Sequence, residues 1–294
     1  MFEIDEVVMM PKDTEELSTA LEELKINTNV GPCIICDAWY GFPKEGRPRK
    51  ERILAVSKQI HNFTSWRSNY MKEKTQNRGS QVFVIGEASD VECINERVIE
   101  LEGKEAENNN NKDVDEENYT RKVSFLPGKK LEDLAKELLT GTTIDAKAES
   151  KQSIMYLSPD AKEKLNASKL PPRIVVVGML VDRKVQPNRS KLRAESLGCR
   201  NNDDENASTL DSDDMVIPVQ LPLDALHVKD LCKDEPLNID TVMEMMERWW
   251  INSHKRGEAQ GNKYFIDAAA RALLTHRQRH PKRVLHGGAS ELLK

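Results

Sequence analysis

Residues 174–177, Ile-Val-Val-Val, limit the possible folds of this chain more than any other feature. A run that is apolar on both faces and rich in β-branched residues is typical of a strand buried on both sides of a parallel sheet. The strand breaks at Gly178, and the chain then continues through Asp182 and a basic loop to a helical pattern that ends at Gly198. Parallel strands are joined by helical crossovers, so this stretch predicts an α/β fold with a mostly parallel sheet flanked by helices.

Similar patterns recur along the chain. Strands are predicted at 33–37, 82–85, 123–126, 153–158 and 216–223, and helices at 14–25, 49–74, 131–139, 239–253 and 264–276. An edge hairpin is predicted at 91–101, and Ser158 is predicted to cap a helix that begins at Pro159. Two polar low-complexity segments, 102–118 and 201–214, are predicted to be flexible inserts because they have too few apolar residues to order themselves.

Composition and charge restrict the class of protein. The 294 residues carry a formal net charge of −5, yet basic residues gather in three blocks, 44–78, 183–200 and 263–283. Such blocks indicate local contact with phosphates or solvated helix faces. The longest apolar runs are too short to span a membrane, and the first residues resemble neither a secretory signal nor an organellar presequence. An odd number of cysteines, five, indicates a reducing compartment, which predicts a cytoplasmic or nuclear protein.

Several side chains are candidates for chemistry, each with a structural alternative. Asp182 lies just after the buried strand and is surrounded in sequence by basic residues. Its carboxylate can either contact a ligand at the end of the strand or form a structural pair with a neighbouring Arg. Asp37 ends the first strand beside Trp39 and Tyr40, so these residues form either a strand cap with packed rings or the wall of a pocket. The spacing of His276 and His280 is compatible with a metal, but without an acidic partner it favours phosphate contact or solvation.

Two sequence motifs of nucleotide-binding loops are absent from the chain. No G-x-G-x-x-G follows any predicted strand, and no G-x-x-x-x-G-K-[ST] occurs anywhere in the chain. Cys33 and Cys36 form a C-x-x-C, but residues three apart on a strand face opposite ways, which argues against a metal or redox pair. A dehydrogenase or another nucleotide enzyme with a phosphate loop is therefore disfavoured.

Four segments together resemble a known family. The strings VVVGMLVDRKVQPNRSKLRAESLG, YLSPDA, VQLPL and LNIDTVMEMM are similar, in this order, to segments of the tRNA position-nine N1-methyltransferases of the SPOUT class. Matching segments run from about residue 34 to residue 250, most of the chain. Many relatives have a second glycine where this chain has Met179.

The resemblance implies a fold and a site. It implies a SPOUT methyltransferase domain at 29–256 with a C-terminal trefoil knot, crossed by 178–188 and 221–236, between an N-terminal helical extension (1–28) and a basic helical tail (257–294). S-adenosylmethionine is expected to bind in the knot, chiefly to main-chain groups. The expected cofactor-binding residues are Leu157, Ser158, Val177, Gly178, Met179, Asp182, Leu221, Pro222, Leu223 and Asn238.

The implied reaction is methylation of N1 of the purine, guanine in the first instance, at position nine of tRNA. Asp182 is the expected general base, with Asp37 assisting, and the enzyme is expected to work as a monomer without a metal. Contact with tRNA is expected from Arg49, Arg52, Arg67, Arg183, Lys184, Arg189, Lys191, Arg193, Arg277 and Arg279. The alternative is a non-catalytic tRNA-binding subunit of a tRNA-processing complex.

Overall fold

A seven-stranded, entirely parallel sheet forms the centre of the protein, in the order β3-β2-β1-β6-β4-β7-β5. The computed structural model describes residues 32–74, 79–108, 123–140, 154–180, 187–198, 216–226, 237–256 and 261–279. The strands are β1 (Cys33–Asp37), β2 (Gln81–Gly86), β3 (Val123–Pro127), β4 (Ile154–Leu157), β5 (Glu163–Lys164), β6 (Ile174–Gly178) and β7 (Val216–Gln220). The helices are α2 (Gly46–Lys74), α3 (Ala88–Asn108), α4 (Leu131–Thr140), α5 (Arg189–Gly198), α6 (Ile239–Arg256), α7 (Gly261–Arg279) and the short 3-10 helix η1 (Leu223–Leu226).

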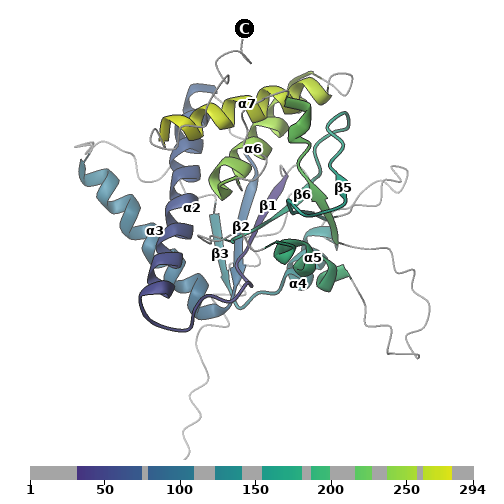
Figure 1. The fold of residues 1–294 in the computed structure, drawn as a ribbon. Coiled ribbons are helices and arrows are strands. Elements are labelled where there is room, and N and C mark those ends of the chain that lie inside the picture. Colours follow the sequence, from purple (N-terminus) through teal and green to yellow (C-terminus); the bar gives the residue numbers. More distant parts are fainter. Residues whose placement is uncertain are drawn as a thin grey trace, which may run out of the picture.

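Helices cover both faces of the sheet, which confirms the predicted α/β architecture (Figure 1). On one face, alternate strand residues such as Ile34 and Val175 pack in a single core with α2, α3, α6 and α7. On the other face, Ile35 and Val176 pack with α4 and α5. The strand at 174–178 lies between β1 and β4 and is buried on both sides, as its apolar run predicts.

Helix α6 is the most deeply buried helix segment of the structure. Every side chain from Thr241 to Trp250 is buried, including Glu244, Glu247 and Arg248. The helix packs against the sheet, α2 and α7, so it has no solvent face over these residues. Charged groups on such a helix need partners inside the protein, because an unpaired buried charge costs several kcal/mol.

Cys33 and Cys36 lie on opposite faces of β1, in the two separate cores, which confirms the interpretation of the C-x-x-C. Both are free thiols. Burial raises the pKa of the Cys33 thiol to about 11 and that of Cys36 to about 12. Because the thiolate is the reactive form, neither thiol is expected to react with alkylating reagents at neutral pH.

We therefore expect iodoacetamide at pH 8 to label the half-buried Cys93 of the native protein and to leave Cys33 and Cys36 unmodified. Mass spectrometry of peptides from the alkylated protein measures each site. Alkylation in urea is the control, in which all three thiols should be modified. Labelling of native Cys36 as fast as Cys93 would contradict the burial of Cys36 between the sheet and α6.

Four local predictions differ from the structure. The segment 91–101 is not a hairpin but part of α3, because Val91, Ile94 and Val98 recur at the helical period and are buried on one side. The same helix extends to Asn108, so the first part of the predicted insert at 102–118 is ordered. No helix begins at Pro159: the chain turns there and forms the short strand β5. Strand β7 ends at Gln220, and η1 follows Pro222.

Other predictions concern residues outside the described ranges. These include the helix at 14–25, all of the second insert and parts of both segments expected to cross in the knot, 181–186 and 227–236. Among the helices of the described residues, none is both long and apolar enough to cross a membrane.

Candidate active site

The carboxyl ends of β1, β6 and β4 meet where the order of the strands changes direction. From β1 the chain continues to β2 and β3 on one side, whereas β6 and β4 lie on the other side. In open α/β sheets, ligands bind outside the carboxyl ends of the strands at such a switch point. Asp37, Gly178 and Leu157 are the last residues of these three strands.

Asp37, the last residue of β1, is fully buried and ionically paired. Its Oδ2 accepts hydrogen bonds from Tyr156 Oη at 3.0 Å and from Arg193 Nε at 3.2 Å. Its Oδ1 accepts one from the main-chain N–H of Trp39 at 2.9 Å. The buried carboxylate of Asp37 therefore joins the end of β1 to β4 and α5.

Tyr40 covers the end of β6. Its hydroxyl forms a short hydrogen bond with the hydroxyl of Tyr156, and burial raises the pKa of both phenols. A Cβ atom added at Gly178 would lie 2.5 Å from the Tyr40 hydroxyl oxygen. Gly178 is not among the positive-φ glycines of the described chain, so its backbone conformation does not require a glycine. A glycine is needed here because a larger side chain would collide with Tyr40.

This close approach predicts a specific coupling. Gly178→Ala should destabilise the protein by about 1–3 kcal/mol, the usual cost of overpacking, because Tyr40 must move. In a Tyr40→Ala background the same change should cost little. Urea unfolding of the two single variants and the double variant measures the coupling; equal costs of Gly178→Ala in both backgrounds would show that Tyr40 is not the obstacle.

Helix α5 brings two predicted RNA-binding cations into the site instead of leaving them on the surface. Arg193 pairs with Asp37, and Arg189 donates a hydrogen bond to the main-chain oxygen of Tyr40, with its guanidinium 5.7 Å from the Tyr40 ring centre. Asn188, just before the helix, has a φ of 62°, a left-handed conformation that Asn tolerates better than most residues. Its N–H donates to Asp160 Oδ2 at 2.6 Å.

The segments predicted to hold the cofactor follow three adjacent strands, β6, β4 and β7. Main-chain hydrogen bonds fix them: Met179 N–H to Asp37 O, Ser158 N–H to Val219 O, and Leu223 N–H to Leu221 O. Leu157, the last residue of β4, and Val177, the penultimate residue of β6, lie in the core, and Pro222 is buried between the half-buried Leu221 and Leu223. Asp182, the predicted base, lies outside the described residues.

Two side chains predicted to bind the cofactor make other contacts. Met179 is 2% exposed and packs in the core with α6, which gives a physical role to the residue that replaces a second glycine. The hydroxyl of Ser158 accepts hydrogen bonds from Ser190 Oγ at 2.8 Å and from Asp160 N–H at 3.3 Å, so it ties α5 to β4 and forms a turn. Asn238 precedes α6, and its main-chain oxygen accepts the N–H of Val242.

The predicted RNA-binding set divides between surface and interior. Arg67 is buried and pairs with Glu247 at 3.3 Å, so its predicted contact with RNA would require it to leave an internal ion pair. Arg49 pairs with Asp90 at 2.6 Å and joins α2 to α3, and Lys191 has a long pair, 3.7 Å, with Glu195. Arg52 is half-buried. Arg183, Lys184 and the side chain of Arg277 are outside the described part of the structure.

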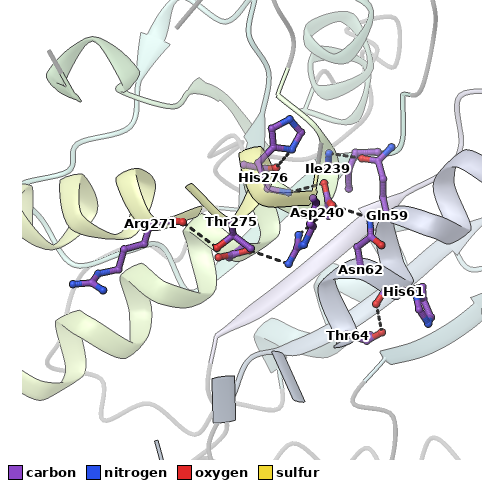
Figure 2. Close-up of polar contacts among 12 residues, drawn as sticks. Gln59, His61, Asn62, Thr64, Ile239, Asp240, Arg271, Thr275 and His276 are labelled. Carbon is purple, nitrogen blue, oxygen red and sulfur yellow. Dashed lines mark hydrogen bonds and ion pairs between the residues drawn. The ribbon is translucent and has the colours of Figure 1, made fainter. Parts of the chain in front are cut away.

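Arg279 and His276, on the predicted basic tail, belong to an internal network between α6, α7 and α2 (Figure 2). Arg279 donates to Asp240 Oδ2 and Glu244 Oε2, both at 3.3 Å. His276 Nδ1 lies 3.1 Å from Thr241 Oγ1. Arg279 therefore holds α7 on α6, with a side chain that is 19% exposed, and its contact with RNA stays a prediction.

No group of His, Cys, Asp and Glu suited to a metal occurs in the described ranges. Sequence reasoning did not identify Tyr156 as a site residue, because one tyrosine in an apolar strand usually belongs to the core. It also treated Arg193 only as a surface cation. The single available signal was that Tyr156 is the first residue of YLSPDA, a segment of the family resemblance, immediately before Leu157, which was expected to contact the cofactor.

No family model matches the sequence, and no curated protein matches it. Among solved structures, the chain is similar to the crystal structure of full-length spTrm10 in complex with SAH, with 14% identity, coverage of 83% of this chain and 98% of that chain, and a TM-score of 0.46. It is also similar to the crystal structure of a dual-specific Trm10 from Thermococcus kodakaraensis, with 11% identity, coverage of 82% and 99%, and a TM-score of 0.44.

Proposed function

We propose that the protein is an S-adenosylmethionine-dependent tRNA methyltransferase that acts on N1 of guanine at position nine. One observation carries the proposal. The three segments that the family resemblance assigns to the cofactor, far apart in the sequence, follow three adjacent parallel strands, β6, β4 and β7. They thus lie at one edge of the sheet, beside the cluster of Asp37, Tyr40 and Tyr156.

The residues at this edge fit S-adenosylmethionine. Leu221 and Leu223 are half-buried and offer apolar surface for an adenine ring, and the loops after β6 and β4 offer main-chain groups. Tyr40 occupies one side of Gly178, so a ligand must approach that residue from another side. When bound, the cofactor supplies an electrophilic methyl group.

The chain's own acids have separate roles in this proposal. Guanine N1 carries a proton that must leave when N1 is methylated, and Asp182 is the proposed acceptor. An aspartate with an ordinary pKa of about 3.9 is a weak base, so the pocket has to raise its pKa. Asp37 is shielded by Tyr156 and Arg193, so we assign it a positioning role and not the direct assistance expected from the sequence.

Binding of tRNA is proposed to involve the N-terminal ends of α2 and α5. Both helices begin after strands β1 and β6 of the site, near its edge of the sheet (Figure 1). The exposed Lys44 lies just before α2, and the start of the helix carries the exposed Arg47 and Lys50. Helix N-termini and cations favour phosphate, and such contacts would help to offset the cost of extruding a base from the tRNA core.

The test uses the purified chain, methyl-labelled S-adenosylmethionine and tRNA transcripts that differ only at position nine. We expect label in the guanine-nine transcript, mapped to that nucleotide by nuclease digestion, and none in a uridine-nine control. Equilibrium binding of S-adenosylhomocysteine is measured on the same preparation. Absence of transfer in a preparation that binds tRNA would contradict the enzymatic proposal.

Asp182→Asn should slow single-turnover methylation of guanine-nine tRNA by about 10²-fold or more, the usual contribution of a general base. Binding of tRNA should remain as in the wild type. Asp160→Asn is a suitable comparison, since that acid lies in the β4 turn and holds Asn188. An unchanged rate with Asp182→Asn would remove this residue as the base.

A further inference from the structure

Four residues form a hydrogen-bonded chain that ends at Tyr40, a half-buried residue beside the end of β6. Arg193 pairs with the buried Asp37, Asp37 accepts from the hydroxyl of Tyr156, and Tyr156 contacts the hydroxyl of Tyr40. Among the described residues, the Tyr40 hydroxyl has a single hydrogen-bond partner, Tyr156. The chain thus links a fully buried carboxylate to a half-buried phenol.

The chemistry of the groups fixes the direction of every hydrogen bond. An ionised carboxylate only accepts, and Asp37 is paired with a guanidinium and accepts two N–H groups besides the phenol. Tyr156 must therefore donate its one hydrogen to Asp37. No hydrogen remains for Tyr40, so Tyr40 must donate its own hydrogen to Tyr156. The oxygen of Tyr40 is left as an acceptor only.

This direction holds over the working range of pH. Burial raises the pKa of Tyr156 well above its ordinary value, and burial also raises the pKa of Tyr40. Both phenols keep their hydrogens, so neither can reverse the chain by ionising.

Tyr40 is also held in place. Arg189 donates to its main-chain oxygen and lies near its ring, and the hydroxyl fills the space above Gly178. An acceptor of fixed position and fixed polarity therefore lies at the end of β6, next to the segments assigned to the cofactor. A fixed acceptor selects ligands that present a donor and disfavours those that present a lone pair or a C–H group.

We propose that Tyr40 selects guanine at the target position by accepting a hydrogen bond from the 2-amino group of the base. This inference rests on the proposed function. Guanine carries the 2-amino donor, whereas adenine has only a C–H group at that position. The N1–H of guanine is a less suitable partner, because the methyl group must enter along that direction, whereas the 2-amino group can stay bonded throughout.

The test compares tRNA that has guanine at position nine with the same tRNA that has inosine there, since inosine differs from guanosine only by lacking the 2-amino group. Binding of both tRNAs is measured at equilibrium with S-adenosylhomocysteine present. We expect the wild type to prefer guanine about tenfold, which corresponds to about 1.4 kcal/mol. Tyr40→Phe should bind both equally.

Two further variants make the test specific. Tyr156→Phe keeps the Tyr40 oxygen but frees its hydrogen, so the preference should fall to a value between those of the wild type and Tyr40→Phe. Tyr264→Phe is the matched control: this buried tyrosine on α7 has a hydroxyl without a hydrogen-bond partner in the described structure, and it should keep the wild-type preference. Circular dichroism verifies that each variant is folded.

Equal binding of the two tRNAs by the wild type, or an unchanged preference in Tyr40→Phe, would overturn the inference. Methyl transfer is measured separately on the same samples. A wild type that prefers guanine but transfers no methyl group would contradict the proposed function and leave the role of Tyr40 in base selection supported. Methyl transfer by a wild type that binds both tRNAs equally would support the proposed function and contradict the role of Tyr40 in base selection.

Discussion

Arg67→Ala is expected to lower the free energy of unfolding by about 3–5 kcal/mol, the usual cost of removing one partner of a buried ion pair. The guanidinium of Arg67 pairs with Glu247 and donates to the main-chain oxygen of Ser80. Without it, the carboxylate of Glu247, which is 1% exposed, keeps hydrogen bonds from Ser80 but loses its counter-charge. Urea unfolding followed by tryptophan fluorescence measures the change.

The control is Lys58→Ala, an exposed cation on the same helix. A surface substitution of this kind usually changes stability by less than about 0.5 kcal/mol. The affinity of folded Arg67→Ala for tRNA, and its dependence on salt, should equal those of the wild type. If Arg67→Ala were as stable as the wild type and its affinity for tRNA depended less on salt, Arg67 would be assigned to the RNA-binding surface.

Asp37→Ala should cost about 3 kcal/mol, the lower end of the range for a broken buried ion pair, because the side chain of Arg193 is 25% exposed and can partly recover solvent. The change also removes the acceptor of Tyr156 and of the Trp39 N–H. If the proposed function is correct, methyl transfer should be lost together with the order of the two tyrosines. Chemical unfolding and single-turnover assays measure the two effects.

Asp267→Ala provides the comparison for Asp37. Asp267 forms an ion pair of similar length with Arg271, 2.9 Å, but both side chains are largely solvent-accessible, and exposed pairs contribute about 0–1 kcal/mol. The difference between the free energies of unfolding lost in Asp37→Ala and in Asp267→Ala therefore reports the effect of burial, because both variants remove an ion pair. Equal costs would mean that Asp37 is not the buried anchor of the site.

Local sequence patterns predicted the architecture well. The apolar runs at 33–36, 82–85 and 174–177 became parallel strands, because burial on both faces favours apolar side chains there. The prediction failed at 91–101, where the apolar residues recur at the helical spacing and the segment is part of α3. Short apolar runs fit both the strand period and the helix period. For this segment, the packing of α3 against α2 and β3 selects the helix.

The site was only partly predictable, because sequence alone gives the charge of a residue but not its distant partner. Arg67, Arg193 and Arg279 all look like surface cations in the sequence. Their partners, Glu247, Asp37 and Asp240, are brought to them by the fold. The sequence correctly placed Gly178 at the end of the buried strand, but the space beside it is taken by Tyr40, a contact that no local pattern contains.

The parallel sheet also has a consequence for how the protein is made. The hydrogen bond between Tyr156 and Asp37 joins residues 119 positions apart, and the pair of Arg193 and Asp37 spans 156 positions. Contacts so distant in sequence slow folding, since a long loop must close before they form. During synthesis Asp37 leaves the ribosome long before Arg193, so an acid destined for the interior stays hydrated until more than half of the chain has emerged.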